Sequence, residues 1–416
     1  MSAEPKIQGR PLGPGQQFFL SFYWLSLNFH WGALLTVVIS MQVLWLVGDA
    51  EKARVLGLLC AAGAFVAMIT QPVVGAFSDR ARFKLGRRRP FVIFGTILNC
   101  LGLAAMAYAP GIAPLVAAFL LVQLTNNISG GAYQGLIPDL VPENQRGSAS
   151  GWMGLMSMLG SIGGILVAGV FMDRHLVAQF YALTGGILIL GAALTVWRVR
   201  EQPLTDVPPF NWREYLSQFW VSPRKHPDFA WVFVARALVM LGFYTMVSFI
   251  NYYLKDVLRL EHFAAVTSYV SGVVMIGAVF STFLGGWLSD RVGRRALVCV
   301  GSLLMGITCL AFLATRSLAV VYAFAVVFGI GYGVFISVDW ALAIDVLPSL
   351  RTAGKDLGIW GIACTLPQVI GPLVGGQVIY AFQGISLVAG YQAVYLLGFV
   401  YLLLGSVFVW RIRGTR

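Results

Sequence analysis

The stretch Gly75-Ala-Phe-Ser-Asp79-Arg80 ends a long apolar run and is followed by Gly86-Arg-Arg88. A closely similar stretch, Gly286-Trp-Leu-Ser-Asp290-Arg291 followed by Gly293-Arg-Arg295, lies 211 residues further along. This offset is close to half of the 416 residues in the chain. A repeat at such a spacing predicts that the chain is built from two similar halves.

A second repeat gives the same result. The segment Asp139-Leu-Val-Pro142, with Arg146 after it, recurs 206 residues later as Asp345-Val-Leu-Pro348, with Arg351 after it. The two offsets are similar although the motifs differ, so the first half of the chain is expected to match the second.

The composition places both halves in a membrane. Hydrophobic residues make up 58% of the chain and charged residues 11%, against about 45–50% and about 25% in ordinary soluble domains. A spanning helix needs about 20 apolar residues, because the hydrocarbon is roughly 30 Å thick. We therefore predict an all-α membrane protein of twelve transmembrane helices, arranged as two six-helix pseudo-symmetric bundles.

The apolar runs, separated by Pro, Gly and charged residues, predict spans at 18–47, 55–78, 91–109, 113–138, 151–172, 177–197, 229–254, 264–288, 297–315, 318–344, 358–382 and 386–410. The predicted domains are a cytoplasmic tail at 1–17, an N-terminal bundle at 18–197, a cytoplasmic linker at 198–228 and a C-terminal bundle at 229–411.

The basic residues predict the orientation. Of the 29 Lys and Arg residues, 22 lie in the termini, the linker and the loops on one side, and 6 lie in the loops on the other. Lys and Arg are retained on the cytoplasmic side, so a multi-pass protein of the cell membrane with both termini cytoplasmic is expected. The net charge of +12 is spread over these short loops, which argues against nucleic-acid binding.

The repeated motifs resemble the major facilitator superfamily over essentially the whole chain. The pattern G-x-x-x-D-R followed by G-R-R in both halves is typical of that superfamily. Further segments resemble its sucrose transporter and glycoside-pentoside-hexuronide:cation symporter branch, and these are Ser78–Pro90, Asn126-Asn127, Tyr133–Pro142, Arg351–Trp360 and Leu366–Gln368. The resemblance implies alternating access and a sugar-like substrate.

The mode of coupling is left open by the resemblance. In sucrose transporters an acidic residue precedes the Asn-Asn pair by three positions, where this chain has Gln123. The second span also lacks the carboxylate that cation-coupled melibiose-type members use. Coupling to H⁺ or Na⁺ and facilitated diffusion are both compatible with these residues.

The repeated Asp and Arg residues are candidates for gating. Carboxylates at the ends of the second and eighth spans can lock the halves together through ion pairs or through the N-terminus of a neighbouring helix. Alternatively, these charged residues only determine the orientation of the chain in the membrane. The gating candidates are Asp79, Arg80, Arg88, Asp290, Arg291 and Arg295 from the first repeat, and Asp139, Arg146, Asp345 and Arg351 from the second.

Ionisable residues inside the spans are candidates for transport, because each costs roughly 2.5–3.5 kcal/mol at a helix centre. His30 lies about 18 Å into the first span, near the midplane, and Asp339 lies in the tenth. Both are candidate proton carriers. At the offset of 206, Asp339 matches Tyr133 and Trp340 matches Gln134, which predicts equivalent positions facing a shared axis.

Sugars need several hydrogen-bonding partners and a flat apolar face. The predicted substrate-binding residues combine amides, aromatic rings and the two ionisable groups, and are His30, Trp31, Asn127, Tyr133, Gln134, Asn251, Asp339 and Trp340. A lone histidine can instead be a packing residue, and Asn126 and Asn127 can bridge helices. Arg236 can snorkel or pair with a carboxylate, and we favour a structural role for it.

Two glycine pairs, Gly160-x-x-x-Gly164 and Gly371-x-x-x-Gly375, predict close packing between helices of the chain. No phosphate-binding loop, metal-ligand cluster or nucleophile motif occurs in the sequence, so neither an enzyme nor a cofactor is expected. The expected partners are a small-molecule substrate, accompanied by H⁺ or Na⁺ if transport is coupled, and the bilayer. The protein is expected to be a monomer.

Three functions fit this sequence. The first is a secondary transporter of a small polar solute such as a sugar or glycoside. The second is an exporter of amphipathic compounds, which predicts a more apolar cavity. The third is a membrane sensor or assembly factor that binds a ligand on the same fold without moving it.

Overall fold

The computed structural model describes residues 12–78, 81–83, 85–136, 140–142, 145–198, 201, 222–346 and 353–413. The secondary structure of these residues is helical, without strands. Lipid offers no hydrogen bonds to the backbone, and a helix satisfies its own N–H and C=O groups. The predicted all-α fold is confirmed.

The elements run along the chain as α1 (Pro14–Ala33), the π-helix η1 (Leu34–Val38), α2 (Ile39–Ser78), α3 (Arg89–Ala107), α4 (Ile112–Gln134), α6 (Arg146–Asp173), α7 (Val177–Arg198), α9 (Pro227–Val247), α10 (Ile250–Asp256), α11 (Phe263–Val292), α12 (Arg294–Ala314), α13 (Leu318–Asp345), α14 (Ala353–Phe382), α15 (Leu387–Phe408) and the 3₁₀-helix η4 (Val409–Arg411).

The number of membrane crossings depends on whether the first long helical segment crosses the membrane once or twice. Within the described ranges, 11 helices are long and apolar enough to cross a membrane, and the first runs for 62 residues from Pro14 to Gly75. At about 1.5 Å per residue this is far longer than one crossing requires. Gly48 interrupts it with φ 72° and ψ −175°, a conformation that only glycine adopts readily. The stretch therefore holds two spans, and the total is twelve as predicted.

The contacts divide the chain into two units. Unit 1 comprises Met1–Leu34 and Val66–Pro209, and unit 2 comprises Leu35–Phe65 and Phe210–Arg416. Residues 35–65 therefore pack with the C-terminal helices, although they belong to the first half of the sequence. The domain limits of 18–197 and 229–411 follow chain order and stay a prediction.

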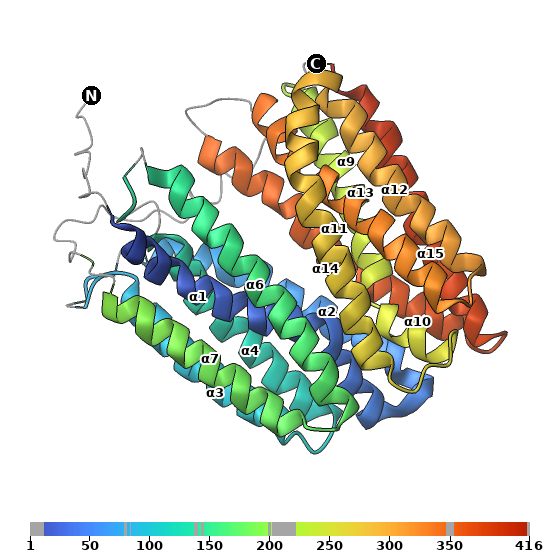
Figure 1. Ribbon diagram of the computed structural model, residues 1–416, viewed down its shortest axis with the longest axis horizontal. Coiled ribbons are helices and arrows are strands. Elements are labelled where there is room, and N and C mark those ends of the chain that lie inside the picture. Colours follow the sequence, from blue (N-terminus) through green and yellow to red (C-terminus); the bar gives the residue numbers. More distant parts are fainter. Residues whose placement is uncertain are drawn as a thin grey trace. The chain divides into compact units, whose positions relative to one another are not determined.

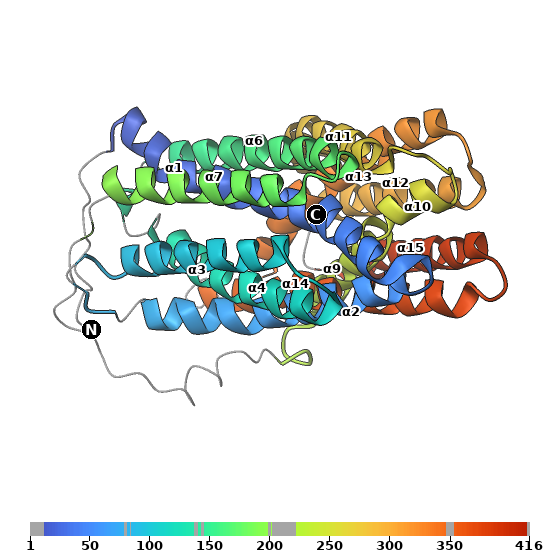
Figure 2. The ribbon, with the colours of Figure 1, turned by 90° about the horizontal axis from the view of Figure 1, so that it is seen from below.

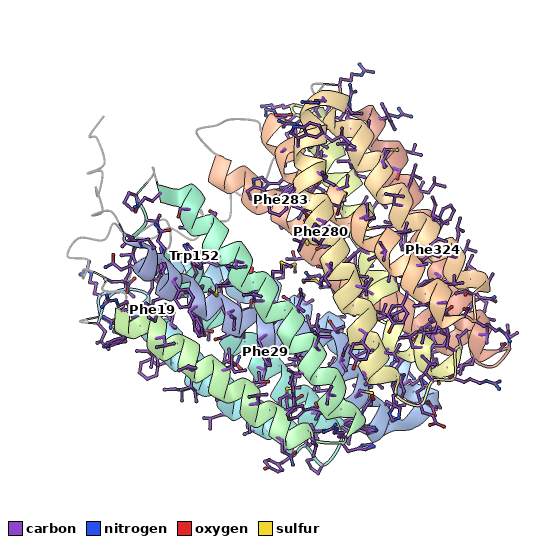
Figure 3. The ribbon with its side chains drawn as sticks, viewed as in Figure 1. Phe19, Phe29, Trp152, Phe280, Phe283 and Phe324 are labelled. Atoms are coloured by element: carbon purple, nitrogen blue, oxygen red, sulfur yellow. The ribbon has the colours of Figure 1, made fainter. Side chains whose placement is uncertain are left out.

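In unit 1, α1 lies along α6 and α7, and α3 lies along α4 and α7 (Figures 1 and 2). Two glycines of α6 allow the approach to α1. A Cβ atom would lie 2.2 Å from the Leu25 carbonyl oxygen at Gly160 and 2.1 Å from that of Phe29 at Gly164. Phe29 is labelled on α1 in Figure 3. The predicted packing role of this glycine pair is confirmed.

In unit 2, α11 lies along α13, α12 along α13 and α15, and α9 along α14 and α15 (Figures 1 and 2). A Cβ atom would lie 3.1 Å from the backbone nitrogen of Thr245 at Gly371 and 2.6 Å from the Phe249 ring at Gly375. The second glycine pair thus also packs as predicted.

The α1–α6 contact gives a test of this packing. We expect Gly164→Ala to lower the melting temperature (Tm) of the purified protein, because the new methyl group meets the Phe29 backbone, which cannot move aside as a side chain can. Overpacking of this kind costs about 1–3 kcal/mol.

The matched control is Gly154→Ala on the same helix, where a Cβ atom has nothing within 4 Å. This variant should melt at or above the temperature of the parent, because alanine favours a helix by about 1 kcal/mol over glycine. Equal Tm values for the two variants would contradict the close α1–α6 contact.

Candidate transport site

Unit 1 contains a buried cluster of polar groups from three helices. It consists of His30 on α1, Asn99 on α3 and Asn126 on α4, which we call the His30 cluster. These side chains are 1%, 2% and 4% exposed. The Asn99 amide nitrogen lies 3.4 Å from the Asn126 amide oxygen, so Asn126 bridges two helices, which is the role that the sequence suggested for it.

The His30 cluster has unused hydrogen-bonding capacity. The Asn126 amide lies near the imidazole but not in hydrogen-bonding geometry, and neither ring nitrogen of His30 has a partner. The Asn99 amide oxygen also lacks one. Buried polar groups without partners are uncommon and need a reason. Here they leave both a donor and acceptors for a polar ligand or a proton.

The other predicted residues of unit 1 differ in their surroundings. Trp31 stacks on His30, with 4.8 Å between the ring centroids. The Asn127 amide accepts a hydrogen bond of 3.0 Å from Gln71 and donates one of 2.7 Å to the Gln123 carbonyl. Asn127 is thus joined to an exposed side chain of α2, since Gln71 is open to the surroundings.

Tyr133 and Gln134 are neighbours in sequence with opposite environments. Tyr133 is fully buried, and its hydroxyl donates a hydrogen bond of 2.6 Å to the Leu20 carbonyl. Its ring packs against Tyr23 and Trp24, so this side chain ties α4 to α1. Gln134 is exposed at the last residue of α4.

Unit 2 contains a second cluster, built around an ion pair. Arg236 on α9 pairs with Asp339 on α13, and its guanidinium carbon lies 3.5 Å from the centroid of the Trp360 ring on α14. Trp340 meets Trp360 edge to face, with 4.9 Å between centroids, and is 50% exposed. We call these four residues the Arg236 cluster.

The Arg236 cluster continues along α9 and α14. The Gln368 amide donates a hydrogen bond of 2.5 Å to the Tyr244 hydroxyl, which also lies 3.8 Å from the Cys364 sulfur. Within the cluster, the Nε of Arg236 and the indole nitrogen of Trp360 have no partner. The arrangement therefore combines one ion pair, two indoles and unpaired N–H donors.

Asn251 is surrounded differently from the two clusters. Its amide nitrogen donates to the Ser40 hydroxyl at 2.7 Å, and its amide oxygen accepts from the Thr267 hydroxyl at 2.7 Å. The side chain is 1% exposed. These bonds join α2, α10 and α11 within unit 2 and use both ends of the amide.

Residues 49–52 and 255–256 form a network of charges inside unit 2. The Lys52 ammonium is 1% exposed and lies 2.6 Å from Asp49 and 2.7 Å from Asp256. Lys255 lies 2.5 Å from Asp49, and the Tyr391 hydroxyl donates to Asp256. This Lys52 cluster holds the first part of α2 against α10 and α15. In the sequence, Lys52 and Lys255 served only to predict the orientation of the chain in the membrane.

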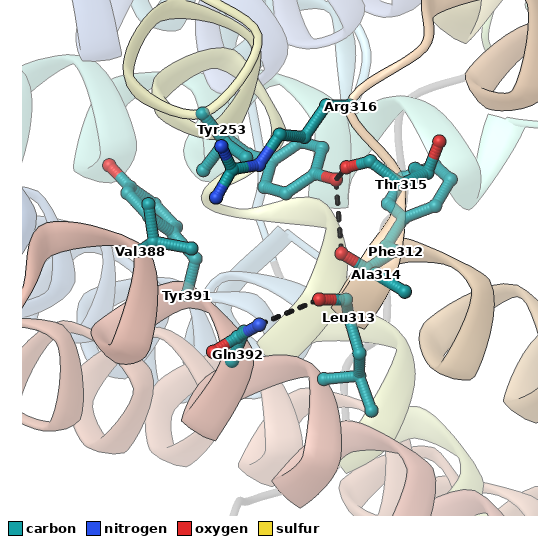
Figure 4. A pocket seen from close by; sticks show the side chains of 10 residues that line it. Tyr253, Phe312, Leu313, Ala314, Thr315, Arg316, Val388, Tyr391 and Gln392 are labelled. Carbon is teal, nitrogen blue, oxygen red and sulfur yellow. Dashed lines mark hydrogen bonds between the residues drawn. The ribbon is translucent and has the colours of Figure 1, made fainter.

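A small pocket lies beside the Lys52 cluster (Figure 4). It has a volume of about 80 Å³ and is lined by residues of the α12–α13 connection and by Tyr253, Tyr391 and Gln392. The Tyr253 hydroxyl lies 3.0 Å from the carbonyl oxygens of both Phe312 and Thr315. Gln392 donates to the Leu313 carbonyl at 2.8 Å. Most of the polar groups that line this pocket therefore already have partners in the protein.

The predicted gating residues are only partly described. Asp79, Arg80, Asp139 and Arg351, and the side chains of Arg146 and Asp290, lie outside the described part of the structure. Arg291 lies over the Trp287 ring, with its guanidinium carbon 4.0 Å from the centroid. Arg295 donates to the Ile412 carbonyl at 2.6 Å, and Asp345 pairs with Arg294 at 2.5 Å.

Arg88 belongs to a network at the start of α3. One Glu201 oxygen accepts the backbone N–H groups of Arg88 at 2.9 Å and Arg89 at 3.1 Å. The Arg88 side chain contacts the Ser78 hydroxyl at 3.3 Å, and Arg89 donates to the Val196 carbonyl at 2.7 Å. Glu201 thus caps the positive end of α3, a role that its place after the sixth span did not reveal.

Comparison with known proteins identifies the family. A family model described as an MFS/sugar transport protein matches residues 33–411. The chain belongs to the major facilitator superfamily. This confirms the resemblance inferred from the repeated motifs. The family and the fold are those of membrane transporters, which are not enzymes.

Relatives and solved structures of this superfamily extend over most of the chain. The multi-drug resistance efflux pump PmrA of Streptococcus pneumoniae is 23% identical over 90% of this chain and 91% of its own. The sucrose transport protein SUC4 of Arabidopsis thaliana is 23% identical over 74% of each.

Two solved structures share the fold. A bacterial homologue of the lysosomal transporter Spinster superposes with a TM-score of 0.75 at 17% identity, covering 96% of this chain and 97% of its own. The nucleoside transporter NupG superposes with a TM-score of 0.77 at 13% identity, covering 95% and 98%.

The Lys52 cluster allows a stability prediction. We expect Lys52→Met to destabilise the protein, because it removes the nearer ammonium partner of the buried Asp256 carboxylate and leaves only Lys255, 3.6 Å away. Loss of the whole of a buried pair costs about 3–5 kcal/mol, which is the upper limit here. The double variant Lys52→Met with Asp256→Asn should recover part of this loss, because it removes the buried carboxylate together with its partner. The measurement is the Tm of the purified protein.

The control is Glu51→Gln, which removes a partner of Arg54 in a pair at 3.5 Å whose side chains are 39% and 42% exposed. An exposed pair contributes about 0–1 kcal/mol, so the Tm should change little. If Lys52→Met melts like Glu51→Gln, the buried pair does not hold α2 in unit 2.

Proposed function

We propose that the protein is a secondary transporter that moves a sugar or glycoside across the cell membrane by alternating access. The observation that supports this most directly is the chemistry of the His30 and Arg236 clusters. Each combines buried polar groups whose hydrogen bonds are incomplete with an indole ring at its edge. Sugar recognition requires both kinds of group, and purely structural packing requires neither.

The family match and the likeness to a sucrose transporter support this substrate class. In the proposal, the solute-binding residues of unit 1 are His30, Trp31, Asn127 and Gln134, and those of unit 2 are Asp339 and Trp340. Tyr133 and Asn251 hold the surrounding helices in place. The protein acts as a monomer, and the repeated Asp and Arg residues of the loops act in gating.

We place both termini in the cytoplasm, as the basic residues predict. The break at Gly48 and the Lys52 cluster then lie at the external end of the helices. There the cluster joins residues of the first repeat to helices of the second, within unit 2.

Export of amphipathic compounds is the second candidate, favoured by the likeness to PmrA over 90% of this chain. The buried charges and amides of the two clusters argue against it, since a binding region for amphipathic compounds is expected to be largely apolar.

Uptake into proteoliposomes tests the proposal. We expect saturable uptake of at least one radiolabelled sugar from a panel of glucose, sucrose and methyl glucosides, competed by the unlabelled sugar. The same sugar should raise the Tm of the purified protein by mass action.

The alternatives give different results in the same experiment. A sensor would show the shift in Tm without flux, and an exporter would move an amphipathic dye but none of the sugars. Either result would overturn the proposed function.

Proton coupling through His30 and Asp339 is a further part of the proposal, because ionisable groups inside a membrane commonly form proton paths. We expect His30→Asn and Asp339→Asn to abolish uptake driven by a proton gradient while sugar counterflow persists with a higher KM, because both side chains also contact the solute. Counterflow needs the binding site and the conformational change but no net proton movement.

The control is Glu261→Gln, which changes an exposed carboxylate in the connection before α11 and should leave both assays unchanged. The Tm of each variant is measured, because Asp339→Asn leaves the Arg236 guanidinium without its partner. Gradient-driven uptake that survives loss of both groups would remove them from the coupling mechanism.

A further inference from the structure

An apolar groove lies on the surface of unit 2 between α11 and α13. It has a volume of about 370 Å³, and the apolar side chains that line it are those of Val273, Ile276, Phe280, Leu284, Val326 and Ile330. Phe280, which Figure 3 labels on α11, is 70% exposed, and Ile330 on α13 is 38% exposed. The groove is therefore open to the surroundings and suited to an apolar ligand.

Glycines bring the two helices together at this groove. A Cβ atom would lie 2.4 Å from the Val274 carbonyl oxygen at Gly329 and 2.1 Å from the Ala278 carbonyl oxygen at Gly333. Gly277, which has no side chain, is itself part of the groove lining. The backbones of α11 and α13 thus meet closely, and the larger side chains beside this contact form the walls.

The wall on α11 continues past the groove to a positive charge. Residues spaced by three or four positions share one face of a helix, and on α11 these are Ile276, Phe280, Leu284, Trp287 and Arg291. Trp287 is 57% exposed, and the guanidinium carbon of Arg291 lies 4.0 Å from the centroid of its ring. The apolar face therefore ends in an exposed indole and an exposed guanidinium.

Arg291 is the cation of this helix end that is open to a ligand. Arg294 pairs with Asp345 at 2.5 Å, and Arg295 donates to the Ile412 carbonyl at 2.6 Å. Within the described ranges no carboxylate pairs with Arg291, which is exposed. A guanidinium binds phosphate through charge-assisted hydrogen bonds, so an anionic group is its natural partner.

The dimensions of this surface match those of a phospholipid. The groove extends from Val273 to Leu284, which is about 16 Å along α11, and one leaflet of hydrocarbon is about 15 Å thick, half of the bilayer core. Arg291 lies about 10 Å beyond Leu284. Trp287 lies between them, at the level where indoles are enriched beside lipid headgroups.

We propose that unit 2 binds one phospholipid with a net negative headgroup, with an acyl chain in the groove between α11 and α13 and its phosphate on Arg291. In the orientation proposed above, this end of α11 lies on the cytoplasmic side, where anionic lipids are concentrated. The site is separate from the His30 and Arg236 clusters, and it does not depend on which solute is transported.

Native mass spectrometry of the purified full-length protein in detergent tests this site. The probes are phosphatidylglycerol and phosphatidylcholine with identical acyl chains. We expect one saturable site per chain that binds phosphatidylglycerol about fivefold more tightly, because one basic residue near the membrane surface attracts an anionic lipid by that amount. Phosphatidylglycerol should also raise the Tm more than phosphatidylcholine does, by mass action.

The first variant removes the charge. Arg291→Gln should weaken phosphatidylglycerol binding about fivefold, to the affinity of phosphatidylcholine, and leave phosphatidylcholine binding unchanged. The matched control is Arg411→Gln, which removes another exposed arginine from the same predicted side of the membrane. This control should keep the fivefold preference.

The second variant fills the groove. Ile330→Trp places a larger apolar side chain where the acyl chain is expected, so both lipids should bind more weakly while their ratio of affinities stays the same. The matched control is Ile307→Trp on α12, at an isoleucine that is 47% exposed and does not line the groove. The Tm of each variant shows whether it is folded.

The other possible occupants give different results. Equal affinities for the two lipids, or many bound lipids without a saturable site, would mean that only the ordinary lipid shell covers this face, and would overturn the proposal. A dimer that forms without lipid and is lost in Ile330→Trp would assign the groove to a second copy of the chain. Binding of glycerol 3-phosphate as tight as that of phosphatidylglycerol would reduce the site to a phosphate site and would also overturn it.

Discussion

The exclusion of water from the bilayer is the constraint on which the rest of this structure depends. Every backbone polar group must be paired inside the protein, which makes each crossing a helix. Side chains obey the same rule, and most buried polar groups here have a partner within hydrogen-bonding distance. Asn251, held between Ser40 and Thr267, and Tyr133, bound to the Leu20 carbonyl, are of this kind. The hydrogen bonds of these two residues join neighbouring helices.

The exceptions to this rule are the basis of the two sites proposed for the solute. His30 and Asn99 in unit 1, and Arg236 and Trp360 in unit 2, are buried and keep unpaired polar atoms. In the proposed function, a bound solute or proton completes these hydrogen bonds during the transport cycle and so offsets their cost to stability. The same reasoning excludes the pocket of Figure 4 as a main site, because its tyrosine and glutamine side chains already bind the neighbouring backbone or Asp256.

Close packing at glycines and ion pairs stabilise the contacts between helices in different ways. Glycines remove side chains where two backbones meet, so the contact depends on shape and tolerates no added atom. Ion pairs act at fewer places and can exchange partners. Residues 35–65 use both devices, since Gly57 meets the backbone of Pro372 while Lys52 pairs with Asp256. A contact of this mixed kind suits a segment that belongs to one repeat and packs with helices of the other.

The sequence by itself determined the membrane class, the twelve crossings, the duplication and the superfamily, because these depend on hydropathy and on motifs that are local in the chain. It also singled out His30 and Asp339, since an ionisable residue inside an apolar run is visible without coordinates. Only the tertiary structure decided which of these groups are paired. That Arg236 meets Asp339 across 103 residues, and that Glu201 caps α3, depends on which helices lie side by side. Hydrophobic periodicity carries no information about that choice, because every span in a membrane is apolar on most of its faces.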